Sequence, residues 1–318
     1  MTKFAGLVAC LAVLCASTAC NREKKRVVAV IPKGNAHLFW QSVHAGAVSA
    51  SRESGTEIIW DGPASETDYT GQLKVVDAMI NRRVDAIALA PIDSKAMVGV
   101  VERAASEGIP VIIFDSGINT DKFVAQVATD NYHAGEMGAE RLGKLLGGKG
   151  KVAMLANMPG SASTVARETG FEDFMKKNFP GIEIVEKQFG NAEVATSLTK
   201  AENILTGHPN LDGIFASNES SSMGFAQALR DRKTRIKMVG FDWTPSLLDD
   251  VRNGVIDSLV VQNPFKMGEQ AMHLALAKLD GKPFEKMNAI APKIVDKENV
   301  DTPEVQAQVN PDLKKYLQ

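Results

Sequence analysis

Apolar runs and amphipathic segments alternate along almost the whole chain beyond residue 26. Residues 27–31 (VVAVI) are apolar throughout, which predicts a strand buried on both faces, and Pro32 ends it. Lys33, Gly34 and Asn35 predict a turn, and a helix can follow from about residue 38 to residue 54. Strand and helix then keep alternating, which is typical of parallel sheets joined by right-handed crossovers.

The alternating elements form two series of similar length, which divide near residue 130. In the first series we expect strands at 27–31, 57–60, 84–90, 110–114 and 124–128, and helices at 38–54, 67–81 and 94–107. In the second we expect strands at 152–156, 182–189, 213–216 and 236–241, and helices at 132–146, 163–178, 192–206 and 220–230. The predicted fold class is α/β, with two Rossmann-like lobes, each a parallel sheet flanked by helices.

The last third of the chain is less regular and holds more elements than the second lobe needs. We expect a helix at 245–253, a strand at 256–261, a helix at 267–279 and one short strand near 290–295. The chain should therefore cross back, so that a multi-strand hinge joins the lobes. The predicted N-terminal lobe is 27–129 plus about 263–289, and the predicted C-terminal lobe is 130–262 plus about 290–318.

The N-terminus has the pattern of an export signal. Lys3 is followed by thirteen uncharged residues and then by Ser17-Thr18-Ala19-Cys20, a stretch too short to span a bilayer. The ending resembles the lipobox of bacterial lipoproteins, although that box prefers Leu where this chain has Ser17. We therefore expect a lipoprotein-type signal peptide at 1–19, lipidation of Cys20 and a polar tether at 20–26. The alternative is cleavage by an ordinary signal peptidase, without a lipid.

Chain length, net charge and cysteine count restrict the classes of protein to which this chain can belong. With 318 residues, 44% of them hydrophobic, the chain is long enough for two domains, and a net charge of −2 gives no general attraction to nucleic acid. Cys10 and Cys15 would leave with the signal peptide, so no disulfide framework is expected.

The informative polar residues stand at predicted strand ends. Asp115 follows VIIF, Asn218 follows GIFAS and Asp242 follows MVGF. Ligands of open α/β sheets bind outside the carboxyl ends of the strands, so these side chains should share one cleft if the lobes face each other. Arg167 lies one turn into a helix at the same rim. The adjacent rings Phe39 and Trp40 begin the first helix, and at least one of them should be partly exposed at the cleft mouth.

Structural alternatives exist for each of these polar residues. Thr244 and Pro245 already suffice to start their helix, so the carboxylate of Asp242 is expected to be free for a ligand. Asp115 could instead form a local Asx-turn, and Asn218 could cap its own helix. Arg167, beside a glutamate, could lie on a solvated face.

The combination of side chains favours a neutral polyhydroxylated ligand. Carboxylates accept hydrogen bonds from hydroxyls, an arginine donates to them, and rings cover an apolar C–H face. Hydrogen bonds to charged groups contribute roughly 1.5 to 3 kcal/mol each. A few of these and one stacked ring amount to about −8 kcal/mol, which is micromolar affinity, after the ligand has been ordered.

These motifs resemble the periplasmic sugar-binding proteins of the ribose and galactose type, which share their fold with LacI-type repressor cores. The resemblance extends from VVAVIP to VVQNPFKMG. Carried over by motif, it implies a set of ligand-binding residues: Phe39, Trp40, Asp115, Arg167, Asn218, Asp242 and Gln262. Beside these stands a second set of candidates: Asn35, His37, Ser116 and Trp243.

The chain departs from this family's pattern at three places. Ser116 stands where ribose-type members often have an arginine, and His37 stands where they have an asparagine, with Asn35 two residues earlier. The aromatic residue expected from the second lobe falls at about Ala192. With these departures the sequence still predicts that the ligand is a sugar. It does not predict which sugar.

The resemblance also implies a function. A small sugar or polyol would close the lobes around the hinge, and the closed form would be recognised by the membrane permease of an ABC transporter. The alternative is a sugar-sensing subunit for a chemotaxis or signalling receptor. We expect a monomer, periplasmic or at the cell surface, anchored to the membrane through Cys20, with no cofactor, no metal and no nucleic-acid partner.

Two other classes are disfavoured by the sequence. No GxGxxG, GxxxxGK[ST] or HExxH motif occurs, so we expect no enzyme and no catalytic residue, although residue type alone would allow paired catalysis by Asp115 and Asp242. A DNA-binding regulator would carry a helix-turn-helix ahead of the first strand, where this chain has a signal and a tether.

Overall fold

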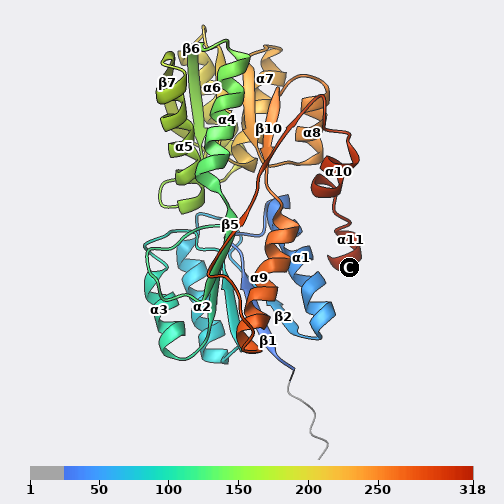
Figure 1. Cartoon of the computed structure of the whole chain (residues 1–318). Coiled ribbons are helices and arrows are strands. Elements are labelled where there is room, and N and C mark those ends of the chain that lie inside the picture. Colours follow the sequence, from blue (N-terminus) through green and yellow to red (C-terminus); the bar gives the residue numbers. More distant parts are fainter. Residues whose placement is uncertain (1–24, 318) are drawn as a thin grey trace, which may run out of the picture.

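The computed structural model describes residues 25–317 and consists of two α/β lobes, one above the other in Figure 1. Each lobe has a six-stranded sheet with helices on both faces. All strand pairs are parallel except β10 with β12. The predicted fold class is therefore confirmed. The predicted signal peptide and Cys20 lie outside the described residues.

The first lobe is built on a sheet of strand order β11-β5-β4-β3-β1-β2. Its strands are β1 (Val27–Ile31), β2 (Glu57–Trp60), β3 (Ala86–Leu89), β4 (Val111–Phe114), β5 (Ala125–Thr129) and β11 (Met287–Ile290). Its helices are α1 (Leu38–Ser54), α2 (Tyr69–Arg82), α3 (Val98–Ser106) and α9 (Pro264–Leu279). Val28 and Val30 pack with α1 and α9, whereas Ala29 and Ile31 pack with α2 and α3. This alternation explains why β1 is apolar at every position.

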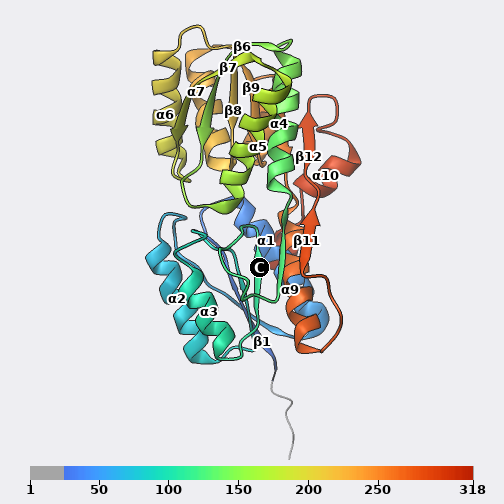
Figure 2. The same ribbon diagram turned by 60° about the vertical axis from the view of Figure 1, so that its left-hand side comes forward.

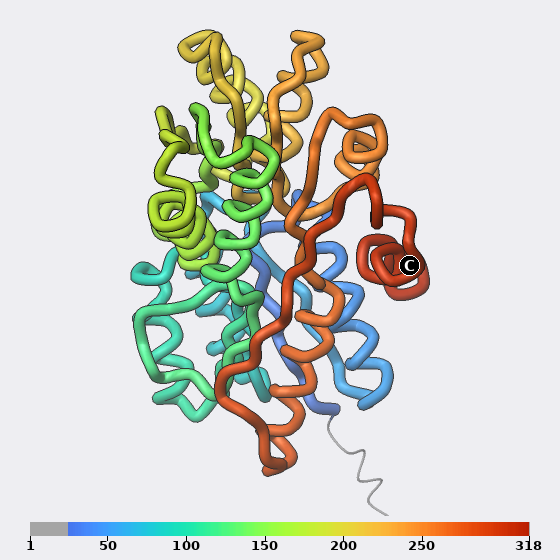
Figure 3. The backbone as a smooth tube through the Cα atoms, turned by 45° about the horizontal axis from the view of Figure 1, so that its top comes forward, coloured from blue at the N-terminus to red at the C-terminus, as the bar shows by residue number. Residues whose placement is uncertain are grey.

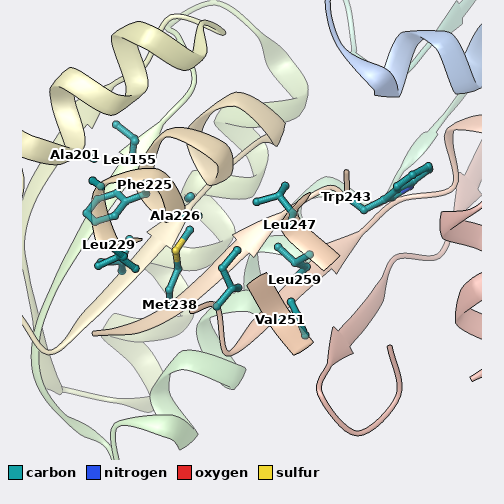
Figure 4. Packing of buried hydrophobic residues seen from close by; sticks show 14 of the residues in the cluster. Leu155, Ala201, Phe225, Ala226, Leu229, Met238, Trp243, Leu247, Val251 and Leu259 are labelled. Atoms are coloured by element: carbon teal, nitrogen blue, oxygen red, sulfur yellow. The ribbon is translucent and has the colours of Figure 1, made fainter. Parts of the chain in front are cut away.

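The second lobe is built on a sheet of strand order β12-β10-β9-β8-β6-β7. Its strands are β6 (Lys149–Ala156), β7 (Gly181–Phe189), β8 (Gly213–Ala216), β9 (Lys237–Phe241), β10 (Ser258–Val261) and β12 (Lys293–Asp296). Its helices are α4 (Asn131–Leu145), α5 (Ala162–Asn178), α6 (Val194–Gly207), α7 (Glu219–Arg232), α8 (Pro245–Arg252) and α10 (Pro303–Val309). One core lies under α4 and α5, and the other lies under α6, α7, α8 and α10. Figure 4 shows the second of these cores.

Within residues 25–317 the chain passes between the two sheets three times: from β5 to α4, from β10 to α9 and from β11 to β12. Figures 1 and 2 show these segments side by side between the lobes. The hydroxyl of Thr129 donates to the Gln262 side chain at 2.7 Å, which ties two of the crossings together. The lobes are thus joined by several strands, as the surplus of late elements predicted.

The C-terminal segment adds a further link between the lobes. After α10, the short helix α11 (Lys314–Leu317) packs on α1 of the first lobe (Figure 3). Arg52 of α1 donates to the backbone carbonyl oxygens of Lys315 and Tyr316 at 2.8 and 3.0 Å, and the Tyr316 ring lies 5.3 Å from the Phe265 ring. Residues 314–317, which fall within the range predicted for the second lobe, thus contact the first lobe.

Two predicted elements differ in detail. The helix predicted from residue 94 begins at Val98, because the Asp93 carboxylate accepts from the N–H groups of Lys95 and Ala96 and forms a turn there instead. The single strand predicted near 290–295 is two strands, β11 and β12, which belong to different sheets. Local pattern cannot show that a short extended segment leaves one sheet and joins another.

Glycines set the distance between paired helices on each lobe. A Cβ atom at Gly135 of α4 would lie 2.0 Å from the carbonyl oxygen of Arg167 in α5, and one at Gly170 of α5 would lie 2.1 Å from that of Tyr132. Gly46 and Gly268 bring α1 and α9 together in the same way. The backbone of α5, and with it Arg167, is held close to α4 by these contacts. Across residues 25–317, no helix combines the length and apolar character needed to cross a membrane.

Candidate functional site

The carboxyl ends of the central strands of both sheets face each other across the interlobe space. A cavity lies there with a free volume of about 30 Å³, which means that the side chains of the two lobes nearly fill it in this closed arrangement. Its wall consists of residues from both lobes: Lys33, His37, Phe39, Trp40, Glu66, Asp115, Asn157, Ser163, Thr164, Arg167, Asn218, Glu219, Asp242 and Gln262. The structure thus brings together all seven residues of the first predicted set, and His37 of the second.

The structure places the other three residues of the second set outside this wall. Asn35 is tied to the first lobe, since its side chain donates to Gly62 O at 3.0 Å and accepts from the Trp60 indole. Ser116 is fully buried behind Asp115. Trp243 lies at the edge of the hydrophobic core of the second lobe (Figure 4).

Phe39 and Trp40 are both buried, at 9% and 2% exposure, so the expectation that one ring is partly exposed was wrong. The rings meet edge to face at 4.9 Å, and the Trp40 indole donates to Glu66 at 2.8 Å. The expectation considered α1 alone, whereas the second lobe covers the start of this helix through Glu219. The rings therefore form an apolar wall inside the cavity rather than at its mouth.

Asp115 is held by Lys33, a residue that was not among the predicted candidates. Its φ of 61° is left-handed, and its Oδ2 lies 2.7 Å from Lys33 Nζ. Lys33 also donates to the hydroxyls of Ser161 and Ser163 across the cleft at 3.2 and 3.0 Å, so all three of its N–H groups are used. The partner of Asp115 is this lysine rather than the backbone of an Asx-turn. A cation two residues after the end of β1 was the signal that could have identified Lys33.

Arg167 is 2% exposed and lies over the Phe241 ring at 4.0 Å, so the solvated-face alternative was wrong. It donates to the Asn131 side chain at 2.7 Å and to the Ser217 carbonyl at 3.1 Å. Burial lowers its pKa, against the opposing effect of Asp242, whose carboxylate lies 4.0 Å away. Such a guanidinium is held in one orientation, with its face packed on a ring and its edge toward the cavity wall.

Asp242 also has a left-handed φ, of 65°. Its Oδ1 accepts from Gln262 at 2.7 Å and its Oδ2 accepts from the backbone N–H of Glu219 at 3.0 Å. Burial raises the pKa of this carboxyl, and Arg167 acts in the opposite direction. Thr244 caps α8, as predicted, so the helix makes no use of Asp242.

Asn218 both lines the cavity and caps its own helix. Its Oδ1 accepts from the N–H of Ser221 at 3.1 Å, and its amide donates to Ser220 and Asn157. The capping role that the sequence left open is therefore present. Asn218 contributes a fixed polar surface whose hydrogen-bonding groups are mostly occupied.

His37 and Glu66 form a buried pair at the edge of the cavity. His37 Nδ1 lies 2.9 Å from Glu66 Oε1, and Nε2 lies 3.0 Å from the carbonyl oxygen of Ala192 in the other lobe. Burial opposes the charge on His37, but Glu66 outweighs it and raises the His37 pKa to about 9. Burial likewise opposes the charge on Glu66, and His37 outweighs it and lowers the Glu66 pKa to about 2. The pair is therefore an imidazolium and a carboxylate at neutral pH.

Glu219 was missed because it stands one residue after the strand-end asparagine and looks like an ordinary first-turn acid. It is 4% exposed, and burial raises its pKa to about 7. Glu66 was missed because it lies in a loop with no motif. Both become recognisable only once the lobes are placed together.

The arrangement is rich in hydrogen-bond acceptors. Among the described residues, Oδ1 of Asp115 and Oε2 of Glu66 have no hydrogen-bond partner, and both side chains line the cavity. A ligand that offers several hydroxyl donors and an apolar face would match these carboxylates and the two rings. Within residues 25–317, no group of three or more His, Cys, Asp and Glu side chains is placed to hold a metal ion.

Comparison with known proteins identifies relatives that span both lobes. A family model described as a periplasmic binding protein domain matches residues 28–283. The ribose import binding protein RbsB of Bacillus subtilis is 30% identical over 248 residues, which cover 78% of this chain and 80% of that protein. The D-allose-binding periplasmic protein of Escherichia coli is 30% identical over 279 residues, covering 84% of this chain and 89% of that protein.

Solved structures agree with these relatives. The solute-binding protein of a carbohydrate transporter from Agrobacterium radiobacter, in complex with D-arabinose, has a TM-score of 0.88 and 31% identity and covers 91% of this chain and 100% of that chain. An ABC transporter solute-binding protein from Agrobacterium vitis with bound D-fucose has a TM-score of 0.87 and 33% identity and covers 89% of this chain and 99% of that chain. The similarity thus includes both sheets and the segments that join them.

Proposed function

The chain belongs to the periplasmic binding protein family, and from this membership we propose that it captures a small sugar or polyol between its lobes and delivers it to the permease of an ABC importer. It is a binding protein rather than an enzyme. The resemblance stated from the sequence motifs is confirmed by the family match and by the relatives.

The observation that carries the proposal is the interlobe cavity with its buried carboxylates, its arginine and its two rings. Asp115 and Asp242 come from opposite lobes and both line the cavity wall. The positive charge of Arg167 interacts favourably with both carboxylates. A ligand that bonds to both aspartates must contact both lobes, so it binds the closed arrangement better than the open one. This supports Phe39, Trp40, Asp115, Arg167, Asn218, Asp242 and Gln262 as the ligand-binding set, with His37 beside them.

The relatives suggest which ligands to test first. Their names refer to ribose, D-allose, xylitol and D-apiose, and the similar structures hold D-arabinose or D-fucose. The relatives named for import favour delivery to a permease over the sugar-sensing alternative. We propose pentoses, hexoses, 6-deoxyhexoses and pentitols as the first panel, because these classes contain the sugars and polyols for which these relatives and structures are named.

The first test is a thermal-shift and calorimetric screen of the exported protein against this panel. A ligand at about 100 times its Kd should stabilise the protein by about 2.7 kcal/mol, which is readily seen as a higher Tm. Binding should also change the fluorescence of Trp40, which lines the cavity. A flat response to every pentose, hexose and polyol would reject a sugar ligand.

Asp242→Asn tests the site itself. The amide keeps the shape of the side chain but removes the charge that hydroxyl donors and Arg167 prefer, so sugar affinity should fall by at least tenfold. Asparagine is preferable to alanine here, because it fills the same space and keeps one oxygen that can accept a hydrogen bond, as the Asp242 side chain does from Gln262 and the Glu219 N–H. Asp249→Asn, with its side chain 64% exposed on α8 of the same lobe, is the control. Normal binding by Asp242→Asn would remove this residue from the site.

The periplasmic location follows from the family. We further propose that Cys20 carries a lipid that anchors the protein to a membrane, and that the protein is a monomer. Cys20→Ser should move the protein from the membrane fraction to the soluble fraction. Recovery of the unchanged protein in the soluble fraction would favour cleavage by an ordinary signal peptidase.

A further inference from the structure

Two helices direct their N-termini at the opposite lobe without a side-chain cap of their own. The N-cap residues are His37 for α1 and Ser161 for α5, and neither side chain accepts from a backbone N–H of its helix. The first N–H groups of a helix have no partner inside it, so they need one elsewhere. By contrast, α4, α7, α8 and α9 each begin with an Asp, Asn or Thr that caps its own helix.

Helix α1 of the first lobe is capped from the second lobe. The N–H groups of Leu38 and Phe39 donate to the two carboxylate oxygens of Glu219 at 3.2 and 3.1 Å. A carboxylate at this position also interacts favourably with the positive end of the helix dipole. The backbone N–H of Glu219 in turn donates to Asp242, a residue of the cavity wall. The cap is therefore connected to the site by one hydrogen bond.

Helix α5 of the second lobe is capped from the first lobe. The N–H of Ser163 donates to the hydroxyl oxygen of Ser116 at 3.1 Å. Lys33, also from the first lobe, donates to the hydroxyl of Ser161, which could otherwise cap its own helix. Ser116 directly follows Asp115, so this cap too is adjacent to a residue of the cavity wall.

We propose that the two lobes cap each other's helices, and that Glu219 and Ser116 are positioning residues that couple sugar capture to closure. The inference rests on the proposed function. When the lobes separate, the N–H groups of Leu38, Phe39 and Ser163 lose these acceptors and are hydrated instead. Each cap therefore stabilises the closed arrangement and leaves the fold of the separate lobes unaffected. Both caps lie next to the aspartates that a sugar would bridge, so ligand contacts and caps form together.

Ser116→Ala is the cleanest test, because Ser116 is fully buried and lies outside the cavity wall. With D-ribose, D-allose and D-arabinose as probes in calorimetry, affinity should fall about fivefold, the usual effect of losing one cap. The Tm of the sugar-free protein should stay close to that of the wild type. Ser116→Thr keeps the hydroxyl and should retain most of the affinity.

Thr302→Ala is the matched control. Thr302 caps α10 of the second lobe through the N–H of Val305, at 3.4 Å and within one lobe. Its loss should lower the Tm of the sugar-free protein and leave sugar affinity unchanged. If Ser116→Ala behaves like Thr302→Ala, the cap is an ordinary structural one and the proposal is overturned.

A second readout needs no sugar and separates this inference from the proposed function. In the sugar-free protein, Ser116→Ala should speed amide hydrogen exchange at Leu38 and Phe39, which belong to the other cap, because both caps break when the lobes open. Glu219→Gln should likewise speed exchange at Ser163. Unchanged exchange at the opposite cap rejects reciprocal capping, even if sugars bind. Coupled exchange without binding of any sugar rejects the sugar ligand and leaves the capping in place.

Discussion

His37 and Glu66 are a charged pair with little contact with water, which gives the protein a testable pH dependence. The His37 pKa is raised from 6.5 to about 9 in the folded state. Its stabilising contribution is therefore fully present below pH 6.5 and is lost as the pH rises through about 9. By linkage, the loss is on the order of 3 kcal/mol. Chemical denaturation of the wild type at several pH values between 6 and 10 should show this fall.

His37→Gln should be less stable than the wild type at neutral pH and should lack the fall above about pH 7.5, whereas the change below that, where Glu219 titrates, should remain. His273→Gln is the control, since that side chain is about half exposed on the surface of α9. An unchanged fall in His37→Gln would show that another group titrates in this range.

At the scale of single residues, the sequence predicted side chains at strand ends well and side chains in loops poorly. Asp115 and Asp242 were identified because an apolar run ending in an aspartate at the cleft edge has few structural uses. Glu66 belongs to a loop whose path depends on both lobes, so no local signal existed. The burial of both rings could not be predicted either, because the covering group, Glu219, lies 180 positions away in the sequence.

The paired helices α4 and α5 depend on glycine at their contact. A methyl group at Gly135 would lie 2.0 Å from the carbonyl oxygen of Arg167, so Gly135→Ala should force the helices apart. We expect a loss of about 1–3 kcal/mol in the free energy of unfolding. Sugar affinity should fall as well, because the displaced helix carries Arg167. Denaturation and calorimetry would measure the two effects.

Gly99→Ala is the matched substitution in a helix without such a contact. Gly99 is an exposed residue of α3, and a Cβ atom there would meet no other atom within 4 Å. Alanine should raise stability by about 0.5–1 kcal/mol, since it is the better helix former. If Gly135→Ala were equally stabilising, the close approach of α4 and α5 would not be required.

At the scale of elements, the hydrophobic period located nearly every strand and long helix, because these are buried on one or both faces and the pattern reflects that burial. The hydrophobic period placed the start of α3 too early, because the Asp93 side chain accepts hydrogen bonds from the backbone N–H groups of Lys95 and Ala96 and forms a turn there. It also failed for β11 and β12, whose partners are set by the position of the hinge and not by their own residues.

The tail that ends in α11 connects the second lobe to α1 of the first, outside the hinge strands. Deleting residues 311–318 should leave both cores intact, because α10 with Val305 and Val309 remains. Without this tether the lobes should separate more readily. Bound sugar should then dissociate several-fold faster in stopped-flow fluorescence, and the sugar-free protein should have a larger radius of gyration in small-angle scattering.

Arg52→Ala should reproduce part of this effect, since it removes both hydrogen bonds to the tail. Arg232→Ala is the control, because that arginine bonds only to residues of its own lobe. Equal dissociation rates for the wild type and the shortened chain would show that the tail does not restrain opening.

For the whole molecule, the sequence predicted two lobes and a multi-strand connection because the late elements outnumbered what one lobe could use. It did not predict the tail, because α11 has only four residues and no apolar period. A segment this short is positioned by Arg52 of α1 and Phe265 of α9, and that information is not contained in its own pattern.

The first sheet is left unfinished at Thr129, and its edge strand β11 and helix α9 are synthesised only after β10 of the second sheet. Without α9, one face of β3, β4 and β5 lacks Met267, Ala271 and Met272 of its core. A nascent chain therefore cannot complete its N-terminal lobe before most of the second lobe has been synthesised, and the second lobe in turn waits for β12 and α10. Pulse-labelled refolding should therefore protect the amides of β1 and β3 together with those of β6 and β8, because each sheet needs a late element of the chain to complete its core.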